Sequence, residues 1–120
     1  PVLVFDEVDT GIGGAVASAV GERLAHLAGQ VQVLVVTHSP QVAARGRHHL
    51  RVAKRVIGKA TTTEVDVLDA DARREEIARM LAGAQVTDAA RQAAASLIEG
   101  ADPQKRPATK QPATGRKRAG

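Results

Sequence analysis

Two adjacent carboxylates, Asp6 and Glu7, directly follow the apolar run of residues 2–5. Such a run is typical of a strand that is buried on both faces of a parallel sheet, and open α/β sheets bind ligands where their strands end. An apolar strand that ends in Asp-Glu has the arrangement of a Walker B segment. There the Asp holds Mg²⁺ beside bound phosphates, and the Glu polarises an attacking water. An acidic turn after the strand is the alternative interpretation.

A glycine-rich loop comes next, since three of the four residues 11–14 are glycine. Glycine permits positive φ angles and close approach of the backbone, which a loop lying against a ligand or a partner subunit requires. An ordinary flexible connection between a strand and a helix is the alternative.

A second apolar strand is expected over residues 32–37, ending at His38. Residues 15–28 carry apolar side chains at spacings of three and four, which predicts a helix between the two strands. A right-handed crossover brings the ends of two parallel strands to the same edge of the sheet. We therefore expect His38 to reach the same ligand as Glu7, although a solvated turn would also suit a histidine.

The remaining elements are a short helix, a hairpin and two longer helices. A short helix is expected at 41–44, and alternating segments at 49–54 and 62–68 predict half-exposed strands of a hairpin around Gly58. Residues 71–81 and 87–98 read as helices, with Asp71 and Thr87 as N-caps and Gly83 ending the first. The first of these helices has apolar residues at Ile77, Met80 and Leu81. Four residues of the second are expected to be buried: Ala90, Ala94, Leu97 and Ile98.

Positive charge is concentrated at the end of the chain. The whole sequence has a net charge of +4, but residues 1–100 carry 11 basic and 12 acidic side chains, whereas residues 101–120 carry 6 and 1. Residues 101–120 also have no large apolar side chain, so we expect a disordered basic tail that binds polyanions without sequence preference. A second basic stretch, residues 45–59, is interpreted as a solvated strand edge, with nucleic-acid contact as the alternative.

Length and composition set further limits. A chain of 120 residues suggests about one domain, and the absence of cysteine excludes disulfides and thiolate metal sites. No apolar run approaches the ~18 residues that a membrane span needs. The sequence begins with Pro1 and enters a core strand at once, so we expect a fragment of a longer protein.

Three segments together resemble one family. VLVFDEVDTGIGG, VLVVTHSPQVAA and REEIARMLAG resemble the C-terminal end of the bacterial RecN DNA repair family, which belongs with the SMC-like and ABC-type ATPases. The resemblance covers roughly residues 1–99. It implies an α/β fold over residues 1–100: the C-terminal lobe of a P-loop ATPase head, with an incomplete parallel sheet and flanking helices.

The resemblance also implies roles for particular residues. Asp6 would be the Walker B metal ligand, Glu7 the catalytic base and His38 the switch histidine at the γ-phosphate. The remaining cofactor-binding positions would be Gly11, Gly13, Gly14 and Gln41, the glycines lying in the D-loop region that crosses a dimer interface. The implied cofactors are ATP and Mg²⁺. The implied partners are DNA and a second copy of the head, with no membrane and a cytoplasmic, nucleoid-associated location.

Two departures from the pattern limit what this chain can do alone. Gly13 stands where a typical transporter D-loop ends in Asp, and neither GxxxxGK[ST] nor an SGG-type signature occurs in the sequence. The chain is therefore expected to be inactive by itself. Three alternatives stay open: another SMC-like or ABC-type ATPase, a nonenzymatic nucleic-acid-binding module that works through the tail, and a metal-dependent phosphoesterase that uses Asp6, Glu7 and Asp9.

Overall fold

The computed structural model describes residues 1–102, which form four strands and four helices. In chain order they are β1 (Val2–Asp6), α1 (Gly14–Leu27), β2 (Gln32–Val36), α2 (Pro40–Ala43), β3 (Leu50–Ile57), β4 (Ala60–Val67), α3 (Ala70–Ala82) and α4 (Asp88–Ala101). The predicted disordered tail lies outside the described residues from position 103 onwards. None of the described helices is both long and apolar enough to cross a membrane.

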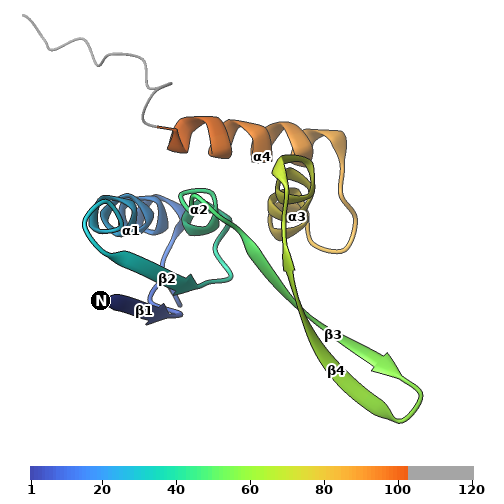
Figure 1. Cartoon of the computed structure of the whole chain (residues 1–120). Helices are drawn as coiled ribbons and strands as arrows, with labels where there is room; N and C mark the ends of the chain where they lie inside the picture. Colours follow the sequence, from blue (N-terminus) through green and yellow to red (C-terminus); the bar gives the residue numbers. More distant parts are fainter. Residues whose placement is uncertain (103–120) are drawn as a thin grey trace, which may run out of the picture.

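The first half of the chain is a strand–helix–strand unit. β1 and β2 pair in parallel, with Val2 opposite Gln32 and Asp6 opposite Val36. α1 connects them and covers one face of the pair, as Figure 1 shows. This confirms the predicted incomplete parallel sheet, and it places the polar residues that follow β1 and β2 at one edge.

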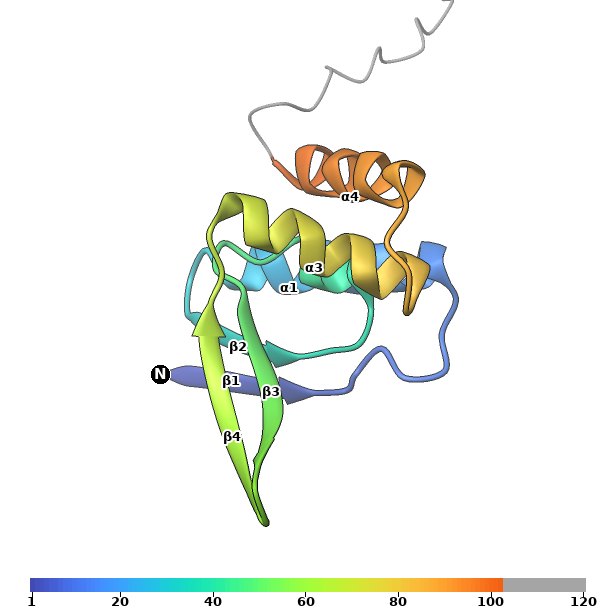
Figure 2. The ribbon, with the colours of Figure 1, turned by 90° about the vertical axis from the view of Figure 1, so that its right-hand side faces the viewer.

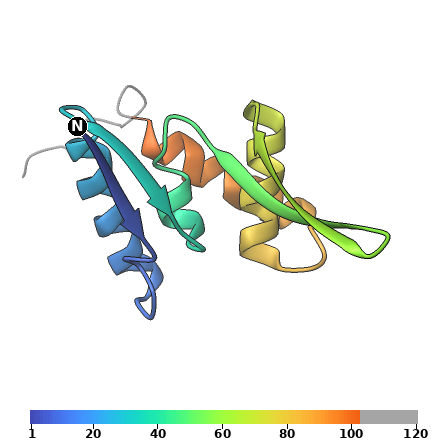
Figure 3. The same ribbon diagram turned by 60° about the horizontal axis from the view of Figure 1, so that its bottom comes forward.

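The expectation that both strands are buried on both faces is wrong for this chain. Val2 and Val4 on β1 are 57% and 63% exposed, and Leu34 on β2 is 48% exposed. Only one layer of described elements covers the strands, and the opposite face is open when the sheet is viewed from below (Figure 3). Side chains that point away from α1 therefore remain in contact with water.

The helix predicted over residues 15–28 forms as α1. Fewer of its residues are buried than its apolar pattern predicts. Ala17 and Gly21 are buried where α1 meets α2, whereas Val16 and Ala19 are exposed. Other apolar residues of α1 border an open groove of about 370 Å³ beside β1. The groove is lined by Phe5, Val8, Val16, Ala19, Val20, Arg23 and Leu24.

The predicted hairpin is present as β3 and β4, which pair from Leu50–Val67 to Ile57–Ala60. Its turn is at Gly58, whose φ of 63° lies in the left-handed region that favours glycine. One face carries an apolar ladder that is more exposed than expected. Its members are Leu50, Val52, Val56, Val65 and Val67.

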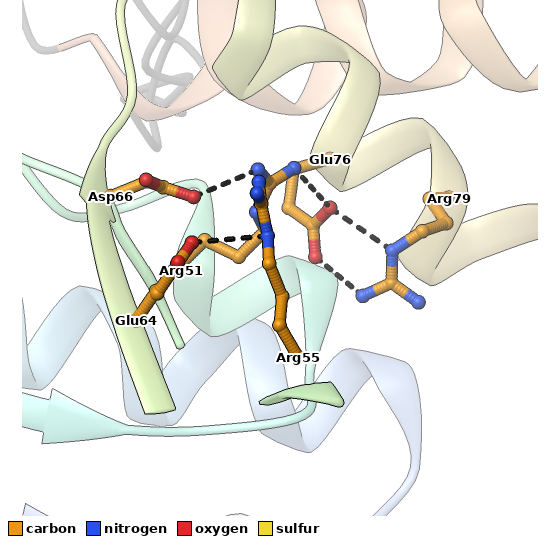
Figure 4. Close-up of polar contacts among 6 residues, drawn as sticks. All are labelled: Arg51, Arg55, Glu64, Asp66, Glu76 and Arg79. Carbon is orange, nitrogen blue, oxygen red and sulfur yellow. Dashed lines mark hydrogen bonds and ion pairs between the residues drawn. The ribbon is translucent and has the colours of Figure 1, made fainter. Parts of the chain in front are cut away.

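The other face of the hairpin is largely polar, and one of its arginines approaches α3. Arg51 pairs with Asp66 on β4 at 3.0 Å and approaches Glu76 of α3 at 4.0 Å (Figure 4). Glu76 is 7% exposed and is hydrogen-bonded by Arg79, one turn further along α3. In the basic stretch of residues 45–59, the side chains of Arg45, Arg51 and Arg55 are thus paired with carboxylates within the chain.

The small core lies between α2, α3 and α4. Ala44, Ile77, Ala78 and Ala94 are buried together, and α4 lies against α3 (Figure 2). Partly buried side chains surround them: Met80, Val86, Ala90, Leu97 and Ile98. Leu81, an apolar residue of α3, is 37% exposed.

The N-terminal caps of α3 and α4 were predicted only in part. Thr87 caps α4 as expected, accepting a hydrogen bond from the N–H of Ala90. The N-cap of α3 is Asp69, not Asp71, because Asp69 Oδ1 accepts from the N–H of Ala72 at 2.8 Å. Asp71 lies in the first turn and pairs with Arg74. Gly83, with φ of 78°, ends α3 as predicted.

The four-residue helix α2 connects the two halves of the structure. It packs on α1 on one side and on α3 and α4 on the other. Arg73 of α3 donates from Nη2 to the carbonyls of Ala43, Ala44 and Gly46, which lie at the C-terminal end of α2. Burial lowers the pKa of Arg73. The loop that contains His38 therefore leads directly into α2, a helix that is packed and hydrogen-bonded against its neighbours.

Candidate nucleotide site at the ends of two strands

Glu7 begins the candidate site, immediately after β1. Its backbone N–H donates to the carbonyl of Val36 at 2.9 Å, which extends the pairing with β2 by one residue. Its φ of 49° is left-handed, and Glu7 is the one non-glycine residue with positive φ in the described chain. Such a conformation is unfavourable for a side chain with a Cβ, and it is concentrated at functional sites.

His38 and Glu7 meet across the strand ends. The Nε2 atom of His38 lies 3.0 Å from Oε1 of Glu7, although the two residues are 31 positions apart. Both side chains are exposed, at 86% and 51%. The parallel register produces this meeting, because it places the residues after β1 beside those after β2. The structure brings the two side chains together as expected, and the ligand that they would share stays a prediction.

A second contact joins the same two loops beneath the first. Asp9 is 8% exposed, and its Oδ2 accepts a hydrogen bond from the hydroxyl of Thr37. Thr37 Oγ1 in turn accepts from the backbone N–H of Ser39 at 2.9 Å. Sequence reasoning missed Thr37. Two features of the sequence could have indicated this contact: a hydroxyl residue at the end of the second strand, and a further carboxylate, Asp9, two residues after Glu7.

Ser39 and Gln41 continue this polar network at the start of α2. Ser39 Oγ accepts from the N–H of Val42 and donates to Oε1 of Gln41 at 3.0 Å, so it both caps the helix and orients the amide. The Nε2 atom of Gln41 lies 3.3 Å from where a Cβ on Gly14 would be. Gly14 therefore gives the Gln41 amide room at the start of α1.

A pocket of about 360 Å³ opens between the glycine-rich loop and α2. Its lining includes four residues to which the family resemblance assigned roles: Gly11, Gly14, His38 and Gln41. Asp6, Glu7 and Gly13 are not among the lining residues, so the pocket gathers only part of the predicted set. The remaining wall is formed by Asp9, Thr10, Ile12, Ala17 and Ser39.

The loop glycines differ in what their conformations require. Gly11 has φ of 77°, which favours glycine, whereas Gly13 is the N-cap of α1 with φ of −74°, which any residue can adopt. A Cβ on either residue would meet nothing within 4 Å. Contacts within the described residues therefore do not require glycine at position 13.

The described residues hold no preassembled cation site around Asp6, the residue expected to bind Mg²⁺. Asp6, the last residue of β1, is exposed and offers one carboxylate. Within residues 1–102, no group of three or more His, Asp or Glu side chains lies close enough to hold a metal ion. Mg²⁺ commonly uses one or two carboxylates and completes its octahedron with water and phosphate oxygens.

The fold resembles that of a known ATPase class. A solved structure from work on "ATP-driven dimerization and DNA stimulated activation of SMC ATPases" matches with a TM-score of 0.59 and 19% identity. The match covers 71% of this chain and 50% of the other. The predicted fold class, α/β and similar to an SMC-like ATPase head, is thereby confirmed.

Sequence comparison gives the family. This chain is 54% identical over 99 residues to the DNA repair protein RecN of Xylella fastidiosa (strain Temecula1), and 53% identical over 100 residues to that of Deinococcus radiodurans. These alignments cover 82% and 83% of this chain, but the chain spans only about 18% of each relative. No family model matches the chain. Over the residues matched, the chain belongs to the family of the DNA repair protein RecN.

Proposed function

We propose that this chain supplies part of the hydrolytic site of an SMC-like ATPase that acts in recombinational repair of DNA double-strand breaks. The contact between His38 and Glu7 at 3.0 Å is the observation that carries the proposal. This contact brings a carboxylate and an imidazole together at the ends of adjacent parallel strands, where open α/β sheets bind ligands. The left-handed backbone of Glu7 supports a functional role for this turn.

The proposed chemistry is attack of water on the γ-phosphate of ATP. The carboxylate of Glu7 orients and polarises the water, and the imidazole of His38 contacts the charge that develops on the phosphate. Mg²⁺ bound at Asp6 would neutralise phosphate charge. Positioning and electrostatics account for most of the catalysis of phosphoryl transfer, so a few well-placed side chains can suffice.

The phosphate-binding loop of this site must come from elsewhere. The sequence has no GxxxxGK[ST] motif, and a single copy of this chain is therefore proposed to be inactive. The glycine-rich loop and Gln41 line a pocket suited to contact with nucleotide or with a second ATPase head. A homodimer of heads, acting on DNA in the cytoplasm at the nucleoid, is the proposed assembly.

The substitution Glu7→Gln in the full-length protein tests the proposal. The amide keeps the shape of the side chain but cannot act as a base. We expect ATP binding to remain and phosphate release to fall by at least about 100-fold. Glu99→Gln is the matched control, because Glu99 is exposed on α4. Normal turnover in Glu7→Gln would refute the assignment of the base.

A second candidate function is nonspecific binding of nucleic acid through residues 101–120. The net charge of +5 in those twenty residues favours it. Deleting residues 103–120 separates the two functions. A chain that works only through the tail loses all DNA binding, whereas an ATPase head keeps nucleotide-dependent activity in the full-length protein.

A further inference from the structure

Asp9 and Thr37 form a buried polar contact between the two loops that carry Glu7 and His38. Asp9 follows Glu7 by two residues, and Thr37 immediately precedes His38. The carboxylate of Asp9 is 8% exposed, and the Thr37 hydroxyl donates to it. A buried carboxylate is costly without a partner, so this contact is strongly favoured once the loops have formed.

The orientation of the Thr37 hydroxyl is fixed from both sides. Its one proton goes to Asp9, and its oxygen accepts the backbone N–H of Ser39 at 2.9 Å. That N–H belongs to the residue after His38. The backbone on either side of the histidine is therefore tied to the loop after β1.

The backbone of Glu7 is held by its hydrogen bond to the carbonyl of Val36, but the side chains of Glu7 and His38 are held less firmly. The two side chains are 51% and 86% exposed, and exposed ion pairs hold their geometry weakly because water competes and side-chain entropy is lost. Beyond the backbone bond between Glu7 and Val36, the more deeply buried Asp9–Thr37 contact is thus a better candidate than the exposed ion pair for setting the separation of the two loops. The same bond also borders the 360 Å³ pocket through Asp9.

We propose that Asp9 and Thr37 are positioning residues whose hydrogen bond sets the placement of His38 relative to Glu7. This inference rests on the proposed function for its catalytic consequence, but its geometric part stands separately. Neither residue is assigned to touch the phosphate. Their effect is transmitted through the backbone of Thr37–Ser39 and of the loop between Glu7 and Asp9.

The geometric part is tested in the 120-residue chain by NMR of the histidine side-chain nitrogens. Thr37→Val removes the hydroxyl and keeps the side-chain shape, and we expect the ring signals of His38 to shift. Thr37→Ser restores the hydroxyl and is expected to return them to the parent positions. Thr63→Val, the same change on exposed β4, is the matched control and should leave them unmoved.

Unchanged His38 signals in folded Thr37→Val would overturn the proposal. If that variant does not fold, Asp9→Asn replaces it. The amide keeps an acceptor oxygen but loses the charge that strengthens the bond. His38 signals must then shift in Asp9→Asn and stay in place in Thr37→Ser, and any other result refutes the positioning role.

The catalytic consequence is tested in the full-length protein. We expect Thr37→Val to lower kcat by about 10-fold to 100-fold with KM for ATP unchanged, since small misplacements of catalytic groups cost rates of this order. Thr37→Ser should restore kcat. A parallel rise in KM alone would contradict positioning. Full turnover in Glu7→Gln would refute the proposed function instead, while leaving the NMR result on Asp9 and Thr37 intact.

Discussion

Gly21 of α1 lies so close to Val42 of α2 that a Cβ added to the glycine would be 3.3 Å from the Val42 Cα atom. The same Cβ would lie 3.3 Å from the Gln41 carbonyl oxygen and 2.9 Å from Cγ of Arg45. The Arg45 contact is near the base of a side chain that is bonded to Glu22, and the backbone atoms cannot move without shifting α2. The packing of α2 on α1 therefore depends on the absence of a side chain at position 21. The His38 loop, which leads into α2, depends on it as well.

Gly21→Ala is expected to lower the stability of the 120-residue chain by about 1 kcal/mol. Overpacking costs about 1–3 kcal/mol, which exceeds the gain of up to about 1 kcal/mol from replacing glycine inside a helix. Urea denaturation followed by circular dichroism measures the difference. Gly100→Ala on α4 is the control, because its Cβ meets nothing within 4 Å and stability should not fall. A Gly21→Ala chain as stable as the parent would show that α2 adjusts freely.

Asp6→Asn in the full-length protein is expected to weaken binding of ATP in the presence of Mg²⁺ by about tenfold or more. The neutral amide is a poorer ligand for a hard cation than a carboxylate. Titration with a fluorescent ATP analogue, with Mg²⁺ and with EDTA, measures the effect. Asp71→Asn, a change at an exposed position of α3, serves as control. Identical Mg²⁺ dependence in Asp6→Asn and the parent would remove Asp6 from the metal site.

Glu76 is expected to make stability fall at acid pH. Its hydrogen bond with Arg79 holds the pKa of the carboxyl below the ordinary value of 4.5, against the opposing effect of burial. Because protonation is less favourable in the folded chain, Glu76 contributes stability above pH 4.5, and this is lost as the pH falls through its lowered pKa. Urea midpoints between pH 6 and pH 3 should therefore decline less in Glu76→Gln. Glu75→Gln, at the neighbouring exposed residue, is the comparison, and equal declines in both variants would contradict the assignment.

The tail is expected to bind duplex DNA with strong dependence on salt. Residues 101–120 contain six basic side chains, so at most about six counterions are released and the log–log slope of affinity against salt should not exceed about −5. Fluorescence anisotropy with a labelled tail peptide between 50 and 200 mM salt measures it. A steeper slope, or preference for one sequence among duplexes of equal length, would indicate contacts beyond nonspecific charge neutralisation.

The sequence determined the order of the elements and the meeting of Glu7 with His38. Periodicity predicted α1 and the hairpin, and Gly58 and Gly83 marked a turn and a helix end, because these signals depend on local conformation. Parallel pairing of the two strands sufficed to bring their ends together, because the carboxyl ends of parallel neighbours lie at the same edge of a sheet. The N-cap of α3 was misplaced by two residues, because Asp69 and Asp71 are chemically equivalent as caps and the backbone decides between them.

Tertiary structure alone decided which apolar residues are covered and which polar residues touch. An apolar run indicates that Val2 and Val4 favour burial, but their exposure depends on whether another layer of elements lies over that face. The hydrogen bond between Asp9 and Thr37 joins residues 28 positions apart, so no local pattern contains it. Local sequence therefore fixed the elements through backbone preferences, whereas burial and the polar contacts of the site arose from how separate elements share space.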